Sequence, residues 1–155
     1  MIRFKLDKYT TENIDKITSI YHFPKDAIAI RICFAFSIQQ GKKYELNNLV
    51  APPSDGREFL PTSNIFGRII DSRDNFFVFQ GILSVHYGME INSDLFVKLF
   101  KLHCEDGATK IINKLSGIDF TSGEHFSFLL KHAQKGLDLQ SDQILVSNNY
   151  TANTV

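Results

Sequence analysis

The chain has 155 residues, which favours one domain, and 43% of them are apolar, with 14 Phe and no Trp. Its 17 basic and 17 acidic residues cancel, and a net charge of zero argues at first against a nucleic-acid partner. Because no uncharged apolar run reaches about eighteen residues, we expect no membrane span, and the N-terminal stretch lacks the apolar core of a signal peptide.

The first predicted element is a short N-terminal strand, in which Ile2, Phe4 and Leu6 alternate with Arg3 and Lys5. Such alternation is typical of a half-buried strand with one cationic face. Two interpretations of that face stay open. The basic side chains reach a DNA groove, as in other strand-based readers, or they only protect the edge of an ordinary strand against stray pairing.

A helix is predicted after this strand, capped by Thr10 or Thr11, with Ile14, Ile17 and Tyr21 at helical spacing. A second helix follows after a short turn. Strand, helix, turn and helix within about forty residues is the order of a ribbon-helix-helix module, in which two chains pair their strands. The predicted fold class is therefore mainly α: a short N-terminal strand followed by a helical bundle, with a ribbon-helix-helix-like N-terminal half.

The central predicted helix lies within Phe23–Gln40 and opens at Pro24, since a missing N–H is tolerated in the first turn. From Ala27 to Ile38 its only charged residue is Arg31. A helix with so little charge is buried almost all round, so the guanidinium must find an acceptor or reach a surface. A fully buried strand is the alternative, although strands of this length are uncommon.

A long connection is predicted between Lys43 and Arg73, a stretch rich in Pro, Gly, Asn, Asp and Ser. Loops of this length inside one domain usually carry function or an interface. The connection is expected to be ordered by apolar residues along it, namely Leu49, Phe59, Ile65, Phe66 and Ile69.

Two apolar helices are predicted next. The first covers residues 75–85, with Asp74 as its cap and Gly88 as its stop. The second runs from Asp94 to about Leu115, capped by Ser93. Its apolar side is predicted to consist of Phe96, Leu99, Phe100, Leu102 and Ile111.

A last helix is predicted after the capping box at Thr121–Glu124. Its inward residues are predicted to be Phe126, Leu129, Leu130 and Leu137. We therefore expect a helical domain over residues 1–112, an additional helix packed on it over residues 113–140, and a flexible tail over residues 141–155. The helices at residues 27–38 and 76–85 are both too apolar to face water, which predicts a dimer or a tetramer.

The cysteines and His103 are expected to pack in the core and not to take part in catalysis or metal binding. Cys33 and Cys104 each lie in an apolar predicted helix, as expected of reduced, packed thiols in a cytoplasmic protein. His103 and Cys104 point to different faces of one helix, so they cannot bind one metal together. We expect His103 to be hydrogen-bonded in the core, with Gly107 allowing close helix packing.

No catalytic constellation is evident, because the sequence offers neither a nucleophile–base pair nor a glycine-rich phosphate loop. Glu58 and the pair Asp71 and Asp74 could bind a divalent ion, but acids in a loop are usually only solvated. We therefore predict no enzyme, no catalytic residue, no metal site and no cofactor.

Basic residues concentrate at the N-terminal end of the chain. Residues 1–43 carry eight Lys or Arg against four acids, whereas residues 44–94 carry three against seven. Oligomerisation could join several such ends into one positive patch. Phosphate binding requires cations and free N–H groups but no sequence code, and a helix N-terminus such as that at Lys25 itself attracts phosphate. The candidate DNA-binding residues are Arg3, Lys5, Lys8, Lys25, Lys42 and Lys43.

Residues 1–112 also resemble a known family. The blocks AIAIRICFAFSIQQ, DGREF, NIFGR and LFKLHCEDGATKI follow one another as in the DNA sulphur modification protein DndE family. The matched positions are Arg31, Ser37, Gly56, Glu58, Phe59, Phe66, Gly67, His103 and Gly107. Two features depart from the family pattern: Asp106 stands where a basic residue is usual, and residues 113–155 extend beyond the usual length.

The resemblance implies a small, helical, tetrameric protein associated with DNA, with a preference for nicked duplex. It implies an accessory role in replacing a non-bridging phosphate oxygen of DNA by sulphur, while a cysteine desulfurase, an iron–sulphur protein and an ATPase perform the chemistry. The implied partners are the DNA backbone, the other DNA sulphur modification proteins and further copies of the chain. Two alternatives stay open: a protein–protein scaffold of that machinery, or a ribbon-helix-helix transcriptional regulator.

Overall fold

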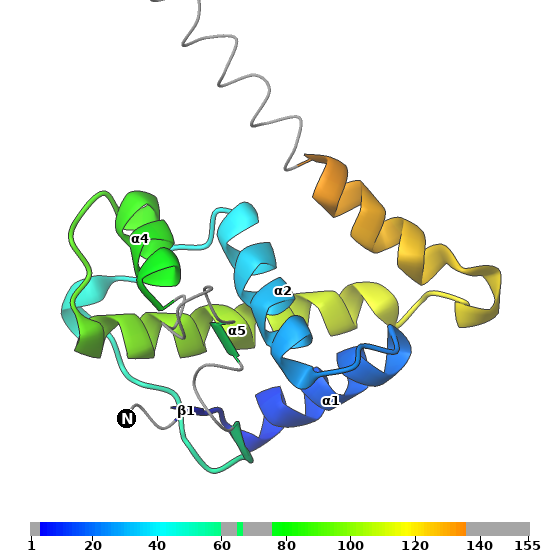
Figure 1. Ribbon diagram of the computed structural model, residues 1–155, viewed down its shortest axis with the longest axis horizontal. Helices are drawn as coiled ribbons and strands as arrows, with labels where there is room; N and C mark the ends of the chain where they lie inside the picture. Colours follow the sequence, from blue (N-terminus) through cyan, green and yellow to red (C-terminus); the bar gives the residue numbers. More distant parts are fainter. Residues whose placement is uncertain (1–3, 60–64, 67–75, 136–155) are drawn as a thin grey trace, which may run out of the picture. The chain divides into compact units, whose positions relative to one another are not determined.

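The computed structural model describes residues 4–59, 65–66 and 76–135, and the chain divides into two compact units, Met1–Gly117 and Ile118–Val155. The predicted mainly α fold with a short N-terminal strand is confirmed (Figure 1). The elements of the first unit are β1 (Phe4–Lys5), α1 (Lys8–Ile20), α2 (Asp26–Gln39), the short 3₁₀ helix η1 (Leu46–Asn48), β2 (Glu58–Phe59), α4 (Phe76–Tyr87) and α5 (Ser93–Leu115).

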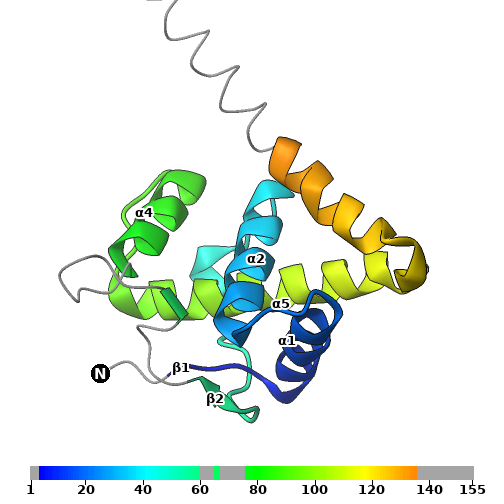
Figure 2. The same cartoon turned by 45° about the vertical axis from the view of Figure 1, so that its right-hand side comes forward.

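Strand β1 pairs with β2 of the same chain in antiparallel register, Phe4 opposite Phe59 and Lys5 opposite Glu58 (Figure 2). The predicted alternation is confirmed in the described residues, since Phe4 is buried and Lys5 only half-buried. The partner strand comes from the connection after α2, whereas a ribbon-helix-helix unit takes it from a second chain. Just beyond the strand pair, the N–H of Gly56 donates to the carbonyl of Leu6 at 3.0 Å, which also holds the connection against the N-terminal segment.

Helix α1 begins at an earlier cap than predicted. The side chain of Asp7 accepts a hydrogen bond from the N–H of Thr10 at 2.8 Å, so Asp7 is the N-cap. A carboxylate in this place satisfies an otherwise unpaired N–H of the first turn, which makes a threonine cap at position 10 or 11 unnecessary. The predicted apolar face is confirmed, since Ile14, Ile17 and Tyr21 are buried.

Helix α2 confirms the central predicted helix and rules out the strand alternative. Its N-cap is Lys25, so Pro24 precedes the helix instead of occupying its first turn. The sequence predicts that Arg31 finds an acceptor or reaches the surface. Arg31 is half-buried, so it reaches the surface. The buried residues of α2 are Ala27, Ala29, Ile30, Cys33, Phe34, Phe36 and Ser37.

Helix α5 is the element against which α1, α2 and α4 all pack (Figure 1). Its N-cap is Asn92, whose side chain accepts from the N–H of Leu95 at 2.9 Å, so the predicted cap at Ser93 is wrong by one residue. Of the predicted apolar side, Leu102 is half-buried. The remaining members, Phe96, Leu99, Phe100 and Ile111, are buried and confirmed.

The aromatic core forms where α2, α4 and α5 meet. Phe100 of α5 stacks on Phe34 of α2, with ring centroids 4.8 Å apart, and lies 5.2 Å from Phe4 of β1. Phe66, from the described part of the connection, lies 5.0 Å from Phe100. Its burial confirms that an apolar residue of the connection anchors it on the core.

The two cysteines lie on the helices that cross at the centre of this unit. Cys33 of α2 and Cys104 of α5 are both free and buried, as predicted. Burial raises the pKa of both thiols, because the charged thiolate is disfavoured away from water. These are therefore packed, unreactive thiols in the folded chain.

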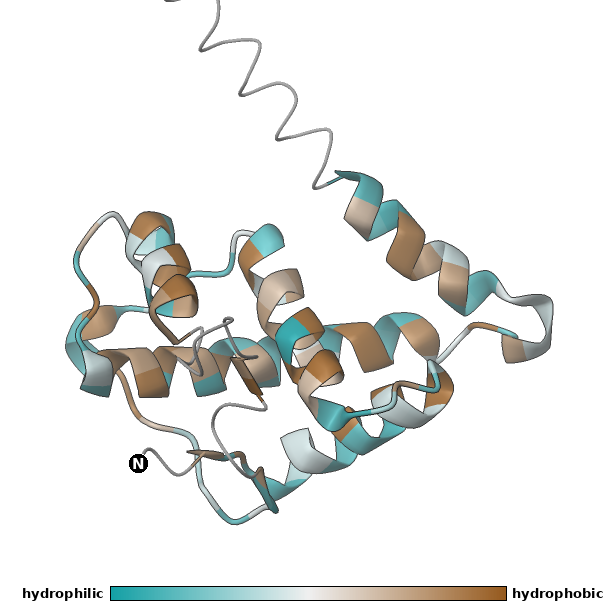
Figure 3. Ribbon diagram, viewed as in Figure 1, coloured by the Kyte–Doolittle hydropathy of each residue, from teal (hydrophilic) through white to brown (hydrophobic). Residues whose placement is uncertain are grey.

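Helix α4 ends as predicted at Gly88, which adopts a φ of 68° suited to glycine; its predicted cap, Asp74, lies outside the described residues. Leu83 is its buried residue, so the single chain leaves α4 largely uncovered, although its apolar sequence predicts a buried helix. Figure 3 shows apolar colouring over this helix. The exposed apolar residues of α4 are Phe77 at 76%, Val78 at 53%, Ile82 at 39% and Val85 at 85%.

The second unit begins with the short 3₁₀ helix η2 (Phe120–Ser122), followed by a helix over residues 124–135. This confirms a last helix, but its start differs from the predicted capping box. Asp119 accepts from the N–H of Thr121, and Ser122 Oγ accepts from the N–H of Glu124. Phe126 and Leu130 are exposed rather than inward, and Leu137 and the predicted tail lie outside the described residues.

No helix of the described residues combines the length and the apolar character needed to cross a membrane.

Candidate nucleic-acid interface

The predicted DNA-binding residues fall into two groups at opposite ends of α2. The N-terminal group consists of Lys5 on β1, Lys8 at the start of α1 and Lys25 at the N-cap of α2. The other group is Lys42 and Lys43, which follow the C-terminal end of α2. Fourteen residues at about 1.5 Å each separate these ends by about 21 Å. Arg3 lies outside the described residues.

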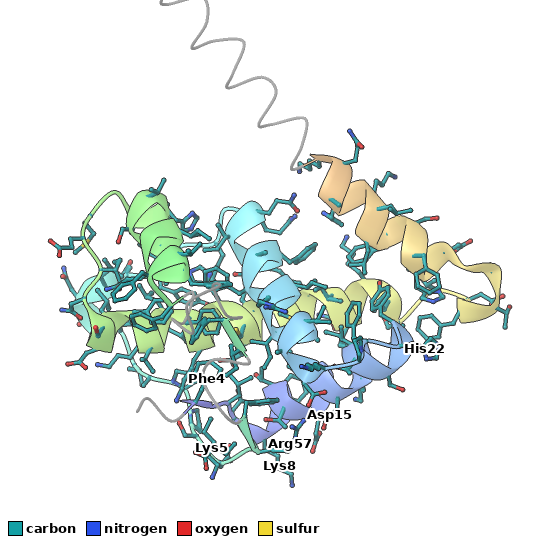
Figure 4. The ribbon with its side chains drawn as sticks, in the orientation of Figure 1. Phe4, Lys5, Lys8, Asp15, His22 and Arg57 are labelled. Carbon is teal, nitrogen blue, oxygen red and sulfur yellow. The ribbon has the colours of Figure 1, made fainter. Side chains whose placement is uncertain are left out.

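An arginine that the sequence did not single out lies beside the N-terminal group. Arg57 forms an ion pair with Asp15 at 2.6 Å (Figure 4) and a second one with Asp26 at 3.0 Å. Partial burial alone would lower the pKa of Arg57, but its hydrogen bonds to the two carboxylates raise it overall. This guanidinium is therefore occupied by carboxylates of α1 and α2.

Carboxylates also surround Lys8. Its backbone N–H donates to Asp55 at 2.9 Å. The side chain borders a hollow of about 390 Å³, whose acidic lining residues are Asp7, Glu12, Asp55 and Glu105. Burial, followed by the charges of Asp7 and Asp106, raises the pKa of Glu105. Lys8 and Arg57 therefore lie among acids, whereas Lys5, Lys8 and Lys25 form no ion pair within the described residues.

The C-terminal group has a different environment. Gly41, with a φ of 74°, ends α2 and turns the chain into the Lys42–Tyr44 segment. Lys43 is exposed, and the Lys42 ammonium lies 4.9 Å from the centroid of the Tyr44 ring. Neither lysine forms an ion pair within the part of the chain that the structure describes. The Lys42 ammonium therefore faces an aromatic ring, and Lys43 faces solvent. Burial, followed by the charges of Asp106 and Glu105, raises the pKa of the Tyr44 hydroxyl, so carboxylates also lie within electrostatic reach of this segment.

The backbone of this segment is bonded to α4 and its aromatic side chain to α5. His86 Nε2 lies 2.6 Å from the carbonyl oxygen of Lys42. The N–H of Tyr44 donates to the hydroxyl of Tyr87 at 3.1 Å, and the hydroxyl of Tyr44 donates to the carbonyl of Leu102 at 3.0 Å. The two lysines therefore follow a helix end whose position is fixed from two further helices.

A buried polar network underlies the segment. The hydroxyl of Ser37 donates to Asp106 Oδ2 at 2.7 Å, so it must accept from His103 Nδ1, 2.8 Å away. His103 Nε2 then accepts from the hydroxyl of Tyr87 at 3.0 Å. Lys110 pairs with the same oxygen of Asp106 at 2.9 Å. The proton directions define one neutral tautomer of His103.

Burial is the main reason that His103 is neutral, and it lowers the imidazole pKa to about 4. The charges of His86, Lys110 and Lys42 lower it further, while Asp106 opposes them. His103 is completely buried, which confirms the predicted hydrogen-bonded core imidazole. Gly107 lies against the backbone of Cys33, which confirms the predicted close helix packing at that glycine.

The network contains a serine, a histidine and an acid, but not in the arrangement of a hydrolase triad. A triad histidine accepts the proton of the serine hydroxyl and receives its own support from the acid. Here the serine donates to the acid and accepts from the histidine, and Ser37 is completely buried. The group therefore supports helix packing instead of nucleophilic attack. The described residues also contain no cluster of three metal-ligating side chains.

Sequence reasoning missed Arg57, Lys110 and the aromatic residues around Lys42. The local signal was present for Lys110, four residues after Asp106 on a helix, the spacing of a side-chain ion pair. The contact of Tyr44 with Tyr87 joins residues 43 positions apart, so no local spacing indicates it.

Comparison with known proteins comes from a family model and a solved structure. The model described as DNA sulphur modification protein DndE matches residues 3–117. The crystal structure of DndE from Escherichia coli B7A, involved in DNA phosphorothioation modification, is similar with a TM-score of 0.55 and 20% sequence identity. The match covers 70% of this chain and 94% of that one, and shows a shared fold. No curated protein sequence matches the chain.

Proposed function

The chain belongs to the DNA sulphur modification protein DndE family, whose model matches residues 3–117, and on that premise we propose that it is an accessory, non-catalytic DNA-binding protein of phosphorothioation. It binds the sugar-phosphate backbone of duplex DNA, with nicked duplex as the favoured form. Lys42 and Lys43 are its principal contacts.

The observation that carries this proposal is that the two lysines after α2 have no ion-pair partner in the described residues. Lys42 and Lys43 are adjacent cations without a carboxylate partner in the described residues, on a segment bonded to α4 and α5. Lysine binds phosphate as a point charge, and such contacts give affinity without sequence preference. The same argument favours a backbone binder over a regulator that reads a specific operator.

Lys5, Lys8 and Lys25, and Arg3 with them, are secondary contacts in this proposal. Lys8 borders an acidic hollow, and Arg57 nearby is paired with two aspartates. A phosphate approaching this edge would meet carboxylate repulsion as well as lysine attraction. In this proposal Lys8 therefore contributes less to binding than Lys42 or Lys43, and Lys5, Lys25 and Arg3 are assigned the same secondary role.

Self-association is part of the proposal, and the exposed apolar face of α4 supports it. Phe77 and Val85 are each more than three-quarters exposed on a helix that has no acidic residue. Burying this face against further copies removes apolar surface from water. A tetramer, which the family resemblance implies, would present several Lys42–Lys43 pairs to one duplex and raise its avidity.

A protein–protein scaffold is the second candidate function, and the same face of α4 is the observation that favours it. Other DNA sulphur modification proteins could bind there instead of a further copy of the chain. A pull-down with the iron–sulphur or ATPase component that survives nuclease treatment would favour the scaffold. For either function we propose the cytoplasm as the location, where DNA is present and thiols such as Cys33 and Cys104 stay reduced.

The test is a binding titration with intact, nicked and single-stranded DNA at two salt concentrations. Wild-type protein should bind duplex with strong salt dependence and little sequence preference, and nicked duplex most tightly. The Lys42→Glu/Lys43→Glu variant should lose at least about tenfold in affinity, because reversal replaces two attractive phosphate contacts by repulsive ones.

The matched control is Lys8→Glu/Lys25→Glu, which changes the net charge by the same amount at the other end of α2. It should lose distinctly less affinity than the first variant. Undiminished binding after reversal of Lys42 and Lys43 would remove the proposed surface. Equal losses in both variants would mean that only total charge matters.

A further inference from the structure

Two consecutive residues of α4 bond to the two peptide groups that flank Lys43. His86 Nε2 lies 2.6 Å from the carbonyl oxygen of Lys42, which belongs to the peptide group before Lys43. Tyr87 accepts from the N–H of Tyr44, which belongs to the peptide group after it, at 3.1 Å. Because peptide groups are planar, fixing both of them fixes the two backbone dihedral angles of Lys43.

The side chain of the neighbouring lysine, Lys42, contacts an aromatic ring. The ammonium of Lys42 lies 4.9 Å from the ring centroid of Tyr44, within the range of a cation–π contact. That ring is itself held, since its hydroxyl donates to the carbonyl of Leu102 on α5 at 3.0 Å. The side chain of one lysine and the backbone of the other are therefore both restrained.

The buried network determines that the hydroxyl oxygen of Tyr87 acts as a hydrogen-bond acceptor. Its own proton is directed to His103 Nε2, 3.0 Å away, which leaves oxygen lone pairs for the N–H of Tyr44. His103 is in turn bonded to Ser37 on α2. The restraint on the segment is thus anchored in the core between α2, α4 and α5.

The bonded peptide groups belong to residues outside the buried core. Lys43 is exposed, and Lys42 and Tyr44 are only half-buried. A backbone group near solvent can bond to water at little cost. Protein partners at this position add order to a partly exposed segment, and order matters where two cations must meet two phosphates at once.

We infer that Tyr87 and His86 are positioning residues for polyanion binding, which hold Lys42 and Lys43 in a preorganised pair. This inference rests on the proposed function of the lysines. It adds that α4 controls their affinity for a DNA backbone without touching the DNA. The ordering entropy of the segment is then lost on folding and not on binding.

The experiment is a double-mutant cycle on nicked duplex DNA with the full chain. Tyr87→Phe keeps the ring but removes both the acceptor of the Tyr44 N–H and the donor to His103 Nε2, and it should weaken binding about three- to tenfold through lost preorganisation. In a Lys42→Ala/Lys43→Ala background the same substitution should change affinity by less than about twofold, because the residues it positions are gone. Tyr9→Phe, at a 55% exposed tyrosine of α1, is the control and should have no effect.

Amide hydrogen exchange measures the restraint without DNA. The Tyr44 amide should exchange faster in Tyr87→Phe than in wild type, while circular dichroism shows unchanged helix content. An unchanged Tyr44 exchange rate would overturn the inference, as would equal losses of affinity in both lysine backgrounds. If Lys42→Ala/Lys43→Ala itself binds DNA like wild type, the proposed lysine surface fails and the positioning role falls with it, whereas faster exchange would still identify the restraint.

Discussion

Gly107 of α5 lies directly against the backbone of Cys33 in α2, so that a Cβ atom at position 107 would stand 1.8 Å from the Cys33 carbonyl oxygen. Backbone cannot move aside as a flexible side chain can. The two helices can therefore keep this distance only with glycine at the crossing. This contact brings Ser37 within reach of both His103 and Asp106 on α5.

The first prediction concerns this crossing. Gly107→Ala should destabilise the fold by about 3 kcal/mol or more, because overpacking against backbone forces the helices apart. Urea denaturation measures the change. Gly117→Ala is the matched control, since a Cβ there meets nothing within 4 Å, and it should change stability by less than about 0.5 kcal/mol. Similar stability of the two variants would contradict the close contact.

The second prediction concerns His103, whose pKa burial lowers to about 4 from an ordinary value of 6.5. Between these pH values the unfolded chain binds a proton that the folded chain does not. Stability should therefore fall as the pH drops from about 6.5 towards 4, by up to about 3 kcal/mol from this residue. Above pH 6.5 both states are neutral and the effect is absent.

Urea denaturation at pH 7 and pH 5 measures the change, with His103→Gln as the comparison that removes the titrating group. The variant should be less stable at pH 7 but show a smaller difference between the two pH values. An NMR titration of the imidazole gives an independent reading. A His103 that titrates near pH 6.5 in the folded protein would contradict the buried, neutral assignment.

The third prediction concerns self-association through α4. Wild-type protein at micromolar concentration should be a dimer or a tetramer by light scattering. Phe77→Glu/Val85→Glu should shift it towards the monomer, because a carboxylate cannot be buried in an apolar interface without a partner. Val50→Glu, at a valine 80% exposed outside α4, should leave the mass unchanged. A wild-type monomer would refute the proposed interface.

Local pattern predicted the helices well because each signal lay within a few residues of its effect. Alternation identified β1, apolar content identified α2 and α4, and Gly88 ended α4 where expected. The His103–Gly107 spacing also sufficed for a correct prediction, since residues four apart share one helix face. The missed cap at Asp7 shows that a carboxylate just before the expected helix competes with hydroxyls inside it.

The rest depended on contacts between distant residues. The partner of β1 lies more than fifty residues later, at Glu58 and Phe59. The carboxylates around Lys8 include Asp55 and Glu105, and charge counting along the chain cannot show that they gather there. The six candidate cations lie within the first 43 residues of the sequence, but α2 separates the five that the structure describes into two groups. Whether lysines share one surface is decided by the helices between them.

Because Cys33 and Cys104 are buried, their reaction with a thiol reagent can measure how often the fold opens. Both sulphur atoms are shielded where α2 and α5 cross, so an alkylating reagent reaches them only when those helices part. Their modification rate in the folded protein therefore follows the opening frequency of the central crossing, with no label added to the surface. DNA binding that restricts the opening of α2 would slow that rate.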